Sequence, residues 1–121
     1  MSLDVSLVNK NVKQLCSCCG GEVIEDEYVY EANITHNLGA MAREAGIYHH
    51  LWRPEELNIT LAKDLIEPIR EGLADMRERS DHYKKYNSEN GWGLYKHFVP
   101  WIQNYLDACI ENPNSIIEVS R

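Results

Sequence analysis

The hydrophobic period changes from two to about 3.6 at Leu38, and this change constrains the fold more than any other feature of the chain. Before it, residues 28–34 (YVYEANI) are rich in aromatic and β-branched side chains, which predicts a strand. After it, apolar residues recur every three or four positions and share one helical stripe: Leu38, Met41, Ala45, Tyr48 and Trp52. The residue before a proline disfavours helical geometry, so we expect this helix to end near Trp52 or Arg53, ahead of Pro54.

Two further apolar stripes predict two longer helices. One begins at Thr60, contains Pro68 and is followed by polar residues up to Tyr86, which we expect to be its frayed or solvent-exposed end. The other runs from Leu94 to Ile110 and stops at residues 112–114 (NPN). Residues 54–57 (PEEL) predict one isolated helical turn.

The remaining strands are less marked. Residues 4–15 alternate weakly and predict a short strand or an arm, and residues 116–119 (IIEV) predict a closing strand whose expected partner is 28–34. Together these elements predict an α+β fold that is mainly helical, with about three amphipathic helices packed on a small β-sheet. We expect a single domain over 1–121, with an N-terminal arm and cysteine turn in 1–27 and a helical core in 28–121.

Composition and charge restrict the class of partner. The chain has 121 residues, 44% of them hydrophobic and 26% charged, as in ordinary soluble proteins. Its net charge of −7 argues against nucleic acid as a partner, because phosphate binding needs a surplus of Lys and Arg. No apolar run approaches the roughly 20 residues of a membrane span, and the N-terminus does not resemble a signal peptide. We therefore expect a cytoplasmic protein with reduced cysteines, no nucleic-acid partner and no membrane partner.

A cysteine-rich turn is the candidate metal site. Cys16 and Cys19 have the CxxC spacing of a zinc knuckle, followed by Gly20, and Cys18 is a third thiol in the same turn. A structural zinc ion needs four ligands and the chain has no second CxxC, so histidines or a neighbouring subunit would have to complete the site. A reduced turn that only packs is the favoured alternative, and zinc is the only cofactor that the sequence suggests.

Polar groups concentrate where the predicted strand meets the predicted helix. Within residues 30–37 (YEANITHN) lie Tyr30, Asn33, Thr35, His36 and Asn37. A helix start leaves backbone N–H groups without partners, and a Thr or Asn side chain can satisfy one. Capping accounts for Thr35 or Asn37, but not for both, nor for Asn33 and His36. The cluster is therefore a candidate binding site, with helix capping and packing as its rival explanation.

The adjoining helix has a face that is almost without side chains. Gly39, Ala42 and Gly46 are spaced three and four apart, and glycine inside a helix costs about 1 kcal/mol relative to alanine. Close packing against another element is the favoured explanation, and a ligand approaching the backbone is the alternative. Arg53, after a helix end, and Trp92, between two glycines, complete the candidate ligand- or partner-binding residues. Neutralisation of the helix dipole is the favoured explanation for Arg53, and packing back onto the domain is the favoured one for Trp92.

Several stretches resemble a group of small, uncharacterised phage and bacterial proteins. They include the 30–38 stretch (YEANITHNL), 46–48 (GIY), 51–56 (LWRPEE), 90–93 (NGWG) and 119–121 (VSR), and the similarity covers about residues 16–121. The resemblance implies a cytosolic context and a mobile-element origin, in which small proteins often serve as accessory or host-interaction factors. It implies no catalytic residue.

Three function hypotheses follow, and the first is favoured. The protein is a non-enzymatic binding or interaction protein that recognises a protein or small molecule at residues 30–37. Alternatively, it is a small enzyme that uses His36, although no nucleophile–base motif accompanies that histidine. The third hypothesis is a structural zinc-knuckle protein. Unpaired edges of a small sheet also suggest a homo-oligomer.

Overall fold

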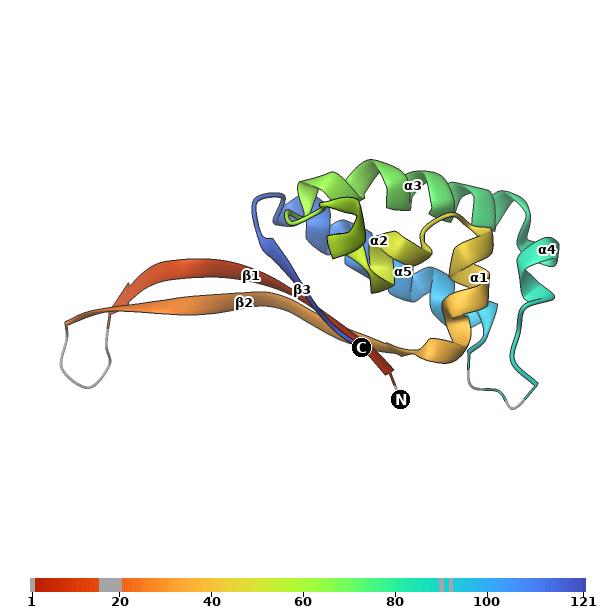
Figure 1. Cartoon of the computed structure of the whole chain (residues 1–121), viewed down its shortest axis with the longest axis horizontal. Helices are drawn as coiled ribbons and strands as arrows, with labels where there is room; N and C mark the ends of the chain where they lie inside the picture. The colour runs from red at the N-terminus through yellow and green to blue at the C-terminus, as the bar shows by residue number, and fades with distance from the viewer. Residues whose placement is uncertain (1, 16–20, 90, 92) are drawn as a thin grey trace.

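The computed structural model describes residues 2–15, 21–89, 91 and 93–121. Its elements, in chain order, are β1 (Ser2–Leu15), β2 (Glu22–Thr35), η1 (His36–Leu38), α1 (Gly39–Glu44), α2 (Tyr48–Trp52), η2 (Pro54–Leu57), α3 (Lys63–Glu78), α4 (Ser80–Lys84), α5 (Tyr95–Glu111) and β3 (Ile116–Ser120). Helices cover one face of a three-stranded antiparallel sheet (Figure 1). The predicted α+β class is confirmed.

The sheet has the order β2-β1-β3, so β1 is its central strand. The expectation that 116–119 would pair with 28–34 is wrong, because β3 pairs with β1 through Val5↔Val119 and Leu7↔Ile117. Strand β2 also pairs with β1, as sequence neighbours joined by a short connection usually do. The alternating residues Leu3, Val5 and Leu7 are at most 1% exposed, as expected for a middle strand under helices.

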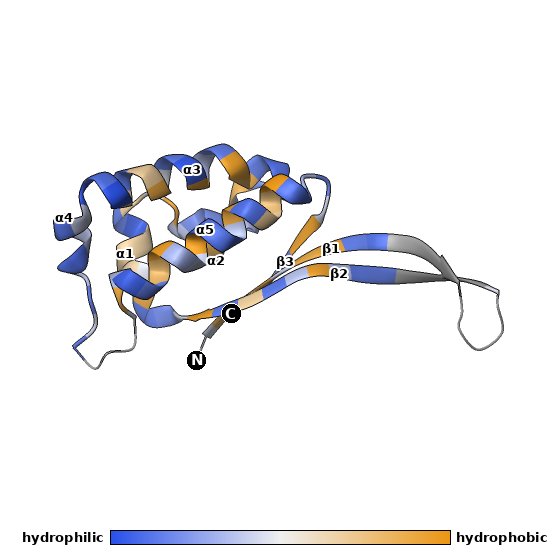
Figure 2. Ribbon diagram, turned by 180° about the vertical axis from the view of Figure 1, so that it is seen from behind, coloured by the Kyte–Doolittle hydropathy of each residue, from blue (hydrophilic) through white to orange (hydrophobic). Residues whose placement is uncertain are grey.

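The β1–β2 hairpin is longer than the sequence suggests and extends beyond the helices (Figure 1). Both strands have 14 residues, whereas β3 pairs only with residues 4–8 of β1. In Figure 2 hydrophobic residues lie on the part of the sheet next to the helices, and the described part of the projecting hairpin is hydrophilic. In the part of β1 next to the helices, the apolar alternation therefore marks the side chains that face the core.

The predicted helix 38–52 is divided into η1, α1 and α2. Gly46 has a positive φ of 76° and follows the end of α1, so it terminates a helix and does not lie inside one. The proposed stripe of small residues is thus wrong at Gly46. Gly39 and Ala42 do lie in α1 and are buried. The predicted end of the helix at Trp52 is confirmed, and so is the isolated helical turn at 54–57.

The two long helices, α3 and α5, pack more extensively against each other than any other pair of helices. Both continue through an internal proline, Pro68 in α3 and Pro100 in α5. Helix α3 begins at Lys63, later than the predicted Thr60, because Leu61 bridges to Ile116 of β3 instead. Among the described residues, no helix has the length and apolarity that crossing a bilayer requires.

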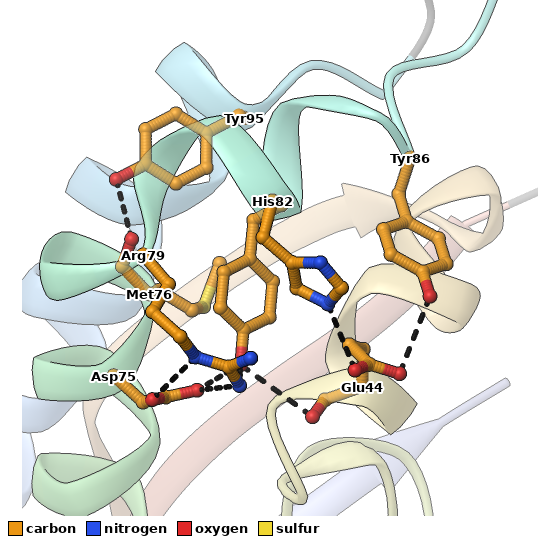
Figure 3. A network of polar contacts seen from close by, with 8 residues as sticks. Glu44, Asp75, Met76, Arg79, His82, Tyr86 and Tyr95 are labelled. Carbon is orange, nitrogen blue, oxygen red and sulfur yellow. Dashed lines mark hydrogen bonds and ion pairs between the residues drawn. The ribbon is translucent and has the colours of Figure 1, made fainter.

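The polar stretch after α3 is not a frayed end. It forms α4, whose Tyr83 is fully buried, and a polar network fixes it to α1 and α3 (Figure 3). The Arg79 guanidinium donates to both carboxylate oxygens of Asp75, at 2.9 and 2.6 Å, and the Tyr83 hydroxyl donates to the same carboxylate. His82 contacts Glu44 of α1 at 2.9 Å. The prediction of a frayed end is wrong because one buried aromatic ring in a polar segment leaves no periodic signal. Arg79, Asp81, Lys84 and Lys85 are exposed, as expected.

Candidate functional site

A pocket of about 940 Å³ opens where β2 runs into η1. We call it the junction pocket. The described residues that line it come from β1, β2, η1, the loop before α5 and the first turn of α5: Ser2, Asn33, Ile34, Thr35, His36, Asn37, Leu38, Gly91, Gly93, Leu94 and His97. Four of the predicted site residues, Asn33, Thr35, His36 and Asn37, therefore share one pocket.

Helix α5 fixes the end of β2 from one side. The Trp101 indole N–H donates to the Asn33 carbonyl oxygen at 2.9 Å. The Trp101 ring also packs on Tyr105, with ring centroids 5.7 Å apart. Tyr105 in turn stacks on Tyr30, with centroids 5.8 Å apart and an angle of 9° between the ring planes. Aromatic pairs at these distances add to area burial, so they hold the strand end against the helix. Tyr30 thus serves packing and does not line the junction pocket.

Helix α2 fixes His36 from the other side. The Trp52 indole N–H donates to His36 Nδ1 at 2.8 Å. Trp52 is only 2% exposed and stacks on Tyr48, with centroids 5.3 Å apart and planes at 11°. The imidazole is half-buried, and its orientation is set by a tryptophan that has little freedom of its own.

The start of η1 is capped by Thr35, one of the two caps that the sequence allowed. Its Oγ1 accepts a hydrogen bond from the Asn37 N–H at 3.3 Å, and its backbone is extended. Gly93 lies directly against this turn, because a Cβ added to it would be 3.0 Å from Asn37 Cβ. Its φ of 113° favours glycine as well. The close approach of Gly93 to Asn37 closes one wall of the pocket.

Three other predicted residues are placed elsewhere or not described. Gly39 packs under the Tyr48 ring, with a Cβ position 3.6 Å from Cε1, which supports the packing explanation for this glycine. Arg53 pairs with Glu56 at 3.0 Å and does not line the junction pocket. Trp92 lies outside the described residues.

The metal ligands suggested by the sequence, Cys16 and Cys19, also lie outside the described residues. Within the described part of the chain, no group of three or more His, Cys, Asp or Glu side chains could hold a metal ion. Cys109 is buried in the core, where burial raises the pKa of its thiol to about 12. That thiol is therefore poorly suited to nucleophilic or metal chemistry at neutral pH.

Sequence reasoning did not find the far wall of the pocket. His97, Leu94 and Gly93 come from the loop before α5 and from its first turn. The glycines of the 90–93 stretch were a signal for a special backbone, but nothing in the sequence placed that loop against residues 33–37. Only the packing of α5 on β2 brings the two segments together.

The described lining of the junction pocket carries fewer charged side chains than the rest of the molecule. Its described lining includes no Asp, Glu, Lys or Arg, although the chain carries 19 acidic and 12 basic residues. His36 and His97 are the titratable groups in that lining. The remaining lining is neutral polar or apolar, a combination typical of sites for small organic molecules.

Comparison with known proteins finds no matching family model, no similar curated protein and no similar solved structure.

Proposed function

We propose that the protein is a non-enzymatic, cytoplasmic binding protein and that the junction pocket is its recognition surface. The observation that carries this proposal is the convergence of Asn33, Thr35, His36 and Asn37 with His97 in one pocket. The volume of about 940 Å³ falls within the range of small-molecule sites. The ligand is a small molecule, and a segment of a partner protein is the alternative.

Two observations favour binding over catalysis by His36. A histidine base needs a group that orients it and a free nitrogen that accepts the proton. Trp52 orients the ring, but its N–H occupies Nδ1, the nitrogen that would accept a proton, and the described lining offers no carboxylate to stabilise a protonated ring. The hypothesis of a histidine-dependent enzyme is therefore the second choice.

The biological setting remains a proposal that rests on the resemblance described above. We propose a phage-derived or bacterial accessory factor that acts in the cytoplasm. We also propose that copies of the chain associate, since the outer edge of β2 has no strand beside it among the described residues. Sedimentation velocity tests association directly, and a monomer at high concentration would contradict it.

The zinc-knuckle hypothesis for Cys16 and Cys19 stays a separate prediction. Metal analysis of protein purified under reducing conditions tests it. One zinc ion per chain would support the hypothesis, and recovery far below one equivalent would reject it.

Native mass spectrometry of the gently purified protein, followed by a fragment screen, tests the binding proposal. We expect a small-molecule adduct or fragment hits that compete for one site. His97→Trp should block the pocket without loss of fold, because His97 is exposed. His49→Trp is the matched control, since His49 is an exposed histidine outside the pocket.

The proposal fails if wild-type protein yields neither adduct nor hits. It also fails if His97→Trp and His49→Trp bind the same ligand equally well, because the binding site would then lie elsewhere.

A further inference from the structure

The hydrogen bond between Trp52 and His36 determines which imidazole nitrogen carries the proton. An indole N–H can only donate, so His36 Nδ1 must accept and must be unprotonated. In a neutral imidazole the proton then resides on Nε2. Protonation of Nδ1 would place two donors face to face at 2.8 Å.

The other nitrogen is free to act on a ligand. Nε2 has no hydrogen-bond partner among the described residues. The buried polar atoms without a partner are His50 Nδ1 and the Tyr105 hydroxyl, so His36 Nε2 is not buried and reaches solvent. His36 lines the junction pocket. In the neutral ring, Nε2–H is a donor and cannot accept a proton, which makes it a recognition group and not a general base.

The lining determines which acceptor suits this donor. An anion would have no Lys or Arg among the described lining residues to pair with, and the net charge of −7 repels it. A cation would have no carboxylate there. An uncharged oxygen acceptor satisfies the donor without leaving an unpaired charge.

We propose that His36 is a hydrogen-bond donor of fixed tautomer and that the junction pocket takes an uncharged ligand presenting a carbonyl or amide oxygen to Nε2–H. This inference rests on the proposed function of the pocket as a binding site. It adds the chemical class of the ligand and the role of one residue.

The tautomer is measured first, in unliganded protein. Long-range ¹H–¹⁵N spectra of the histidine side chains distinguish protonated from unprotonated nitrogens. We expect the Nε2–H form of His36 in about tenfold excess, and we expect Trp52→Phe to reduce this excess about fivefold, as the loss of one hydrogen bond implies. A His36 protonated on Nδ1 overturns the inference. Should Trp52→Phe not fold, the wild-type spectrum decides alone.

The ligand class is measured next, with benzamide, benzoate and benzylamine as probes of similar size and different charge. We expect benzamide to shift the His36 signals and to bind at least about fivefold more tightly than the two charged probes. His49, outside the pocket, is the internal control. Tighter binding of benzoate or benzylamine overturns the inference.

The two proposals can fail separately. If benzamide shifts the His97 signals and leaves those of His36 unchanged, the pocket binds but the donor role of His36 is wrong. If none of the three probes shifts either histidine, both proposals are overturned.

Discussion

At the scale of the residue, two buried helical glycines have opposite surroundings. A Cβ on Gly39 would make an ordinary contact with the Tyr48 ring at 3.6 Å, whereas a Cβ on Gly72 would overlap Ile47 Cγ2. We expect Gly39→Ala to stabilise the protein by about 0.5 kcal/mol through a reduced unfolded-state entropy. We expect Gly72→Ala to destabilise it by about 1–3 kcal/mol through overpacking. Urea unfolding measures both, and two changes of the same sign would contradict the packing described.

The hydroxyl groups of two tyrosines, Tyr105 and Tyr95, allow a similar comparison. Tyr105 is fully buried and its hydroxyl has no hydrogen-bond partner among the described residues, whereas the Tyr95 hydroxyl donates to the Met76 carbonyl at 2.8 Å. We expect Tyr105→Phe to be neutral or to stabilise the fold, since it removes an unpaired polar group. Tyr95→Phe should cost about 1 kcal/mol. A larger loss of stability for Tyr105→Phe than for Tyr95→Phe would show that the Tyr105 hydroxyl has a hydrogen-bond partner.

At the scale of the element, Gly46 decides where α1 ends. Its φ of 76° is in the left-handed region, and an added Cβ would meet nothing within 4 Å. The strain alone predicts that Gly46→Ala costs about 1 kcal/mol. Gly46→Asn should cost less, because asparagine tolerates this conformation better. Equal losses for the two variants, measured by thermal unfolding, would argue against a helix terminus at this position.

The polar network that attaches α4 makes the stability of the fold depend on pH. Hydrogen bonds from Arg79 and Tyr83 lower the pKa of Asp75 from 3.8 to about 2. A lowered carboxyl pKa contributes stability that is present above 3.8 and lost as the pH falls through about 2. Glu44, whose pKa is lowered mainly by the His82 hydrogen bond, acts in the same direction.

We therefore expect the stability difference between wild type and Asp75→Asn to shrink as the pH falls from above 3.8 towards 2. Urea midpoints over this range measure it. Asp107→Asn, an exposed aspartate of α5, is the control and should show a smaller change. A difference that does not depend on pH would mean that Asp75 is not charged against Arg79 in the native state.

At the scale of the whole molecule, the sequence predicted local structure better than assembly. The α+β class, the α2 terminus and the 54–57 turn followed from periodicity and proline rules, which act over a few residues. The pairing of β3 with β1 and the burial of Tyr83 did not, because both depend on contacts distant in sequence. The sequence around Gly46 favours packing over a helix terminus, because a glycine that ends a helix and a glycine on a bare helix face look the same in the sequence.

The candidate site likewise has a part that the local sequence predicts and a part that depends on contacts distant in sequence. The polar cluster at 33–37 was visible in the sequence because it exceeds what helix capping needs. Its opposite wall, with Gly93 and His97, became part of the site only through the packing of α5 on β2. Arg53 is a candidate from its position after a helix end, where neutralisation of the helix dipole is the favoured explanation, and it pairs with Glu56 outside the pocket lining.

A map of backbone amide shifts on titration with benzamide tests the central claim, that the junction pocket is the recognition surface. We predict that the largest changes fall on residues 33–38 and on Gly93, Leu94 and His97, which line the pocket from its two sides. We also predict that His97→Trp abolishes them while His49→Trp leaves them intact. Changes centred instead on the second pocket, around 54–60 and 117–121, or no changes at all, would contradict the account.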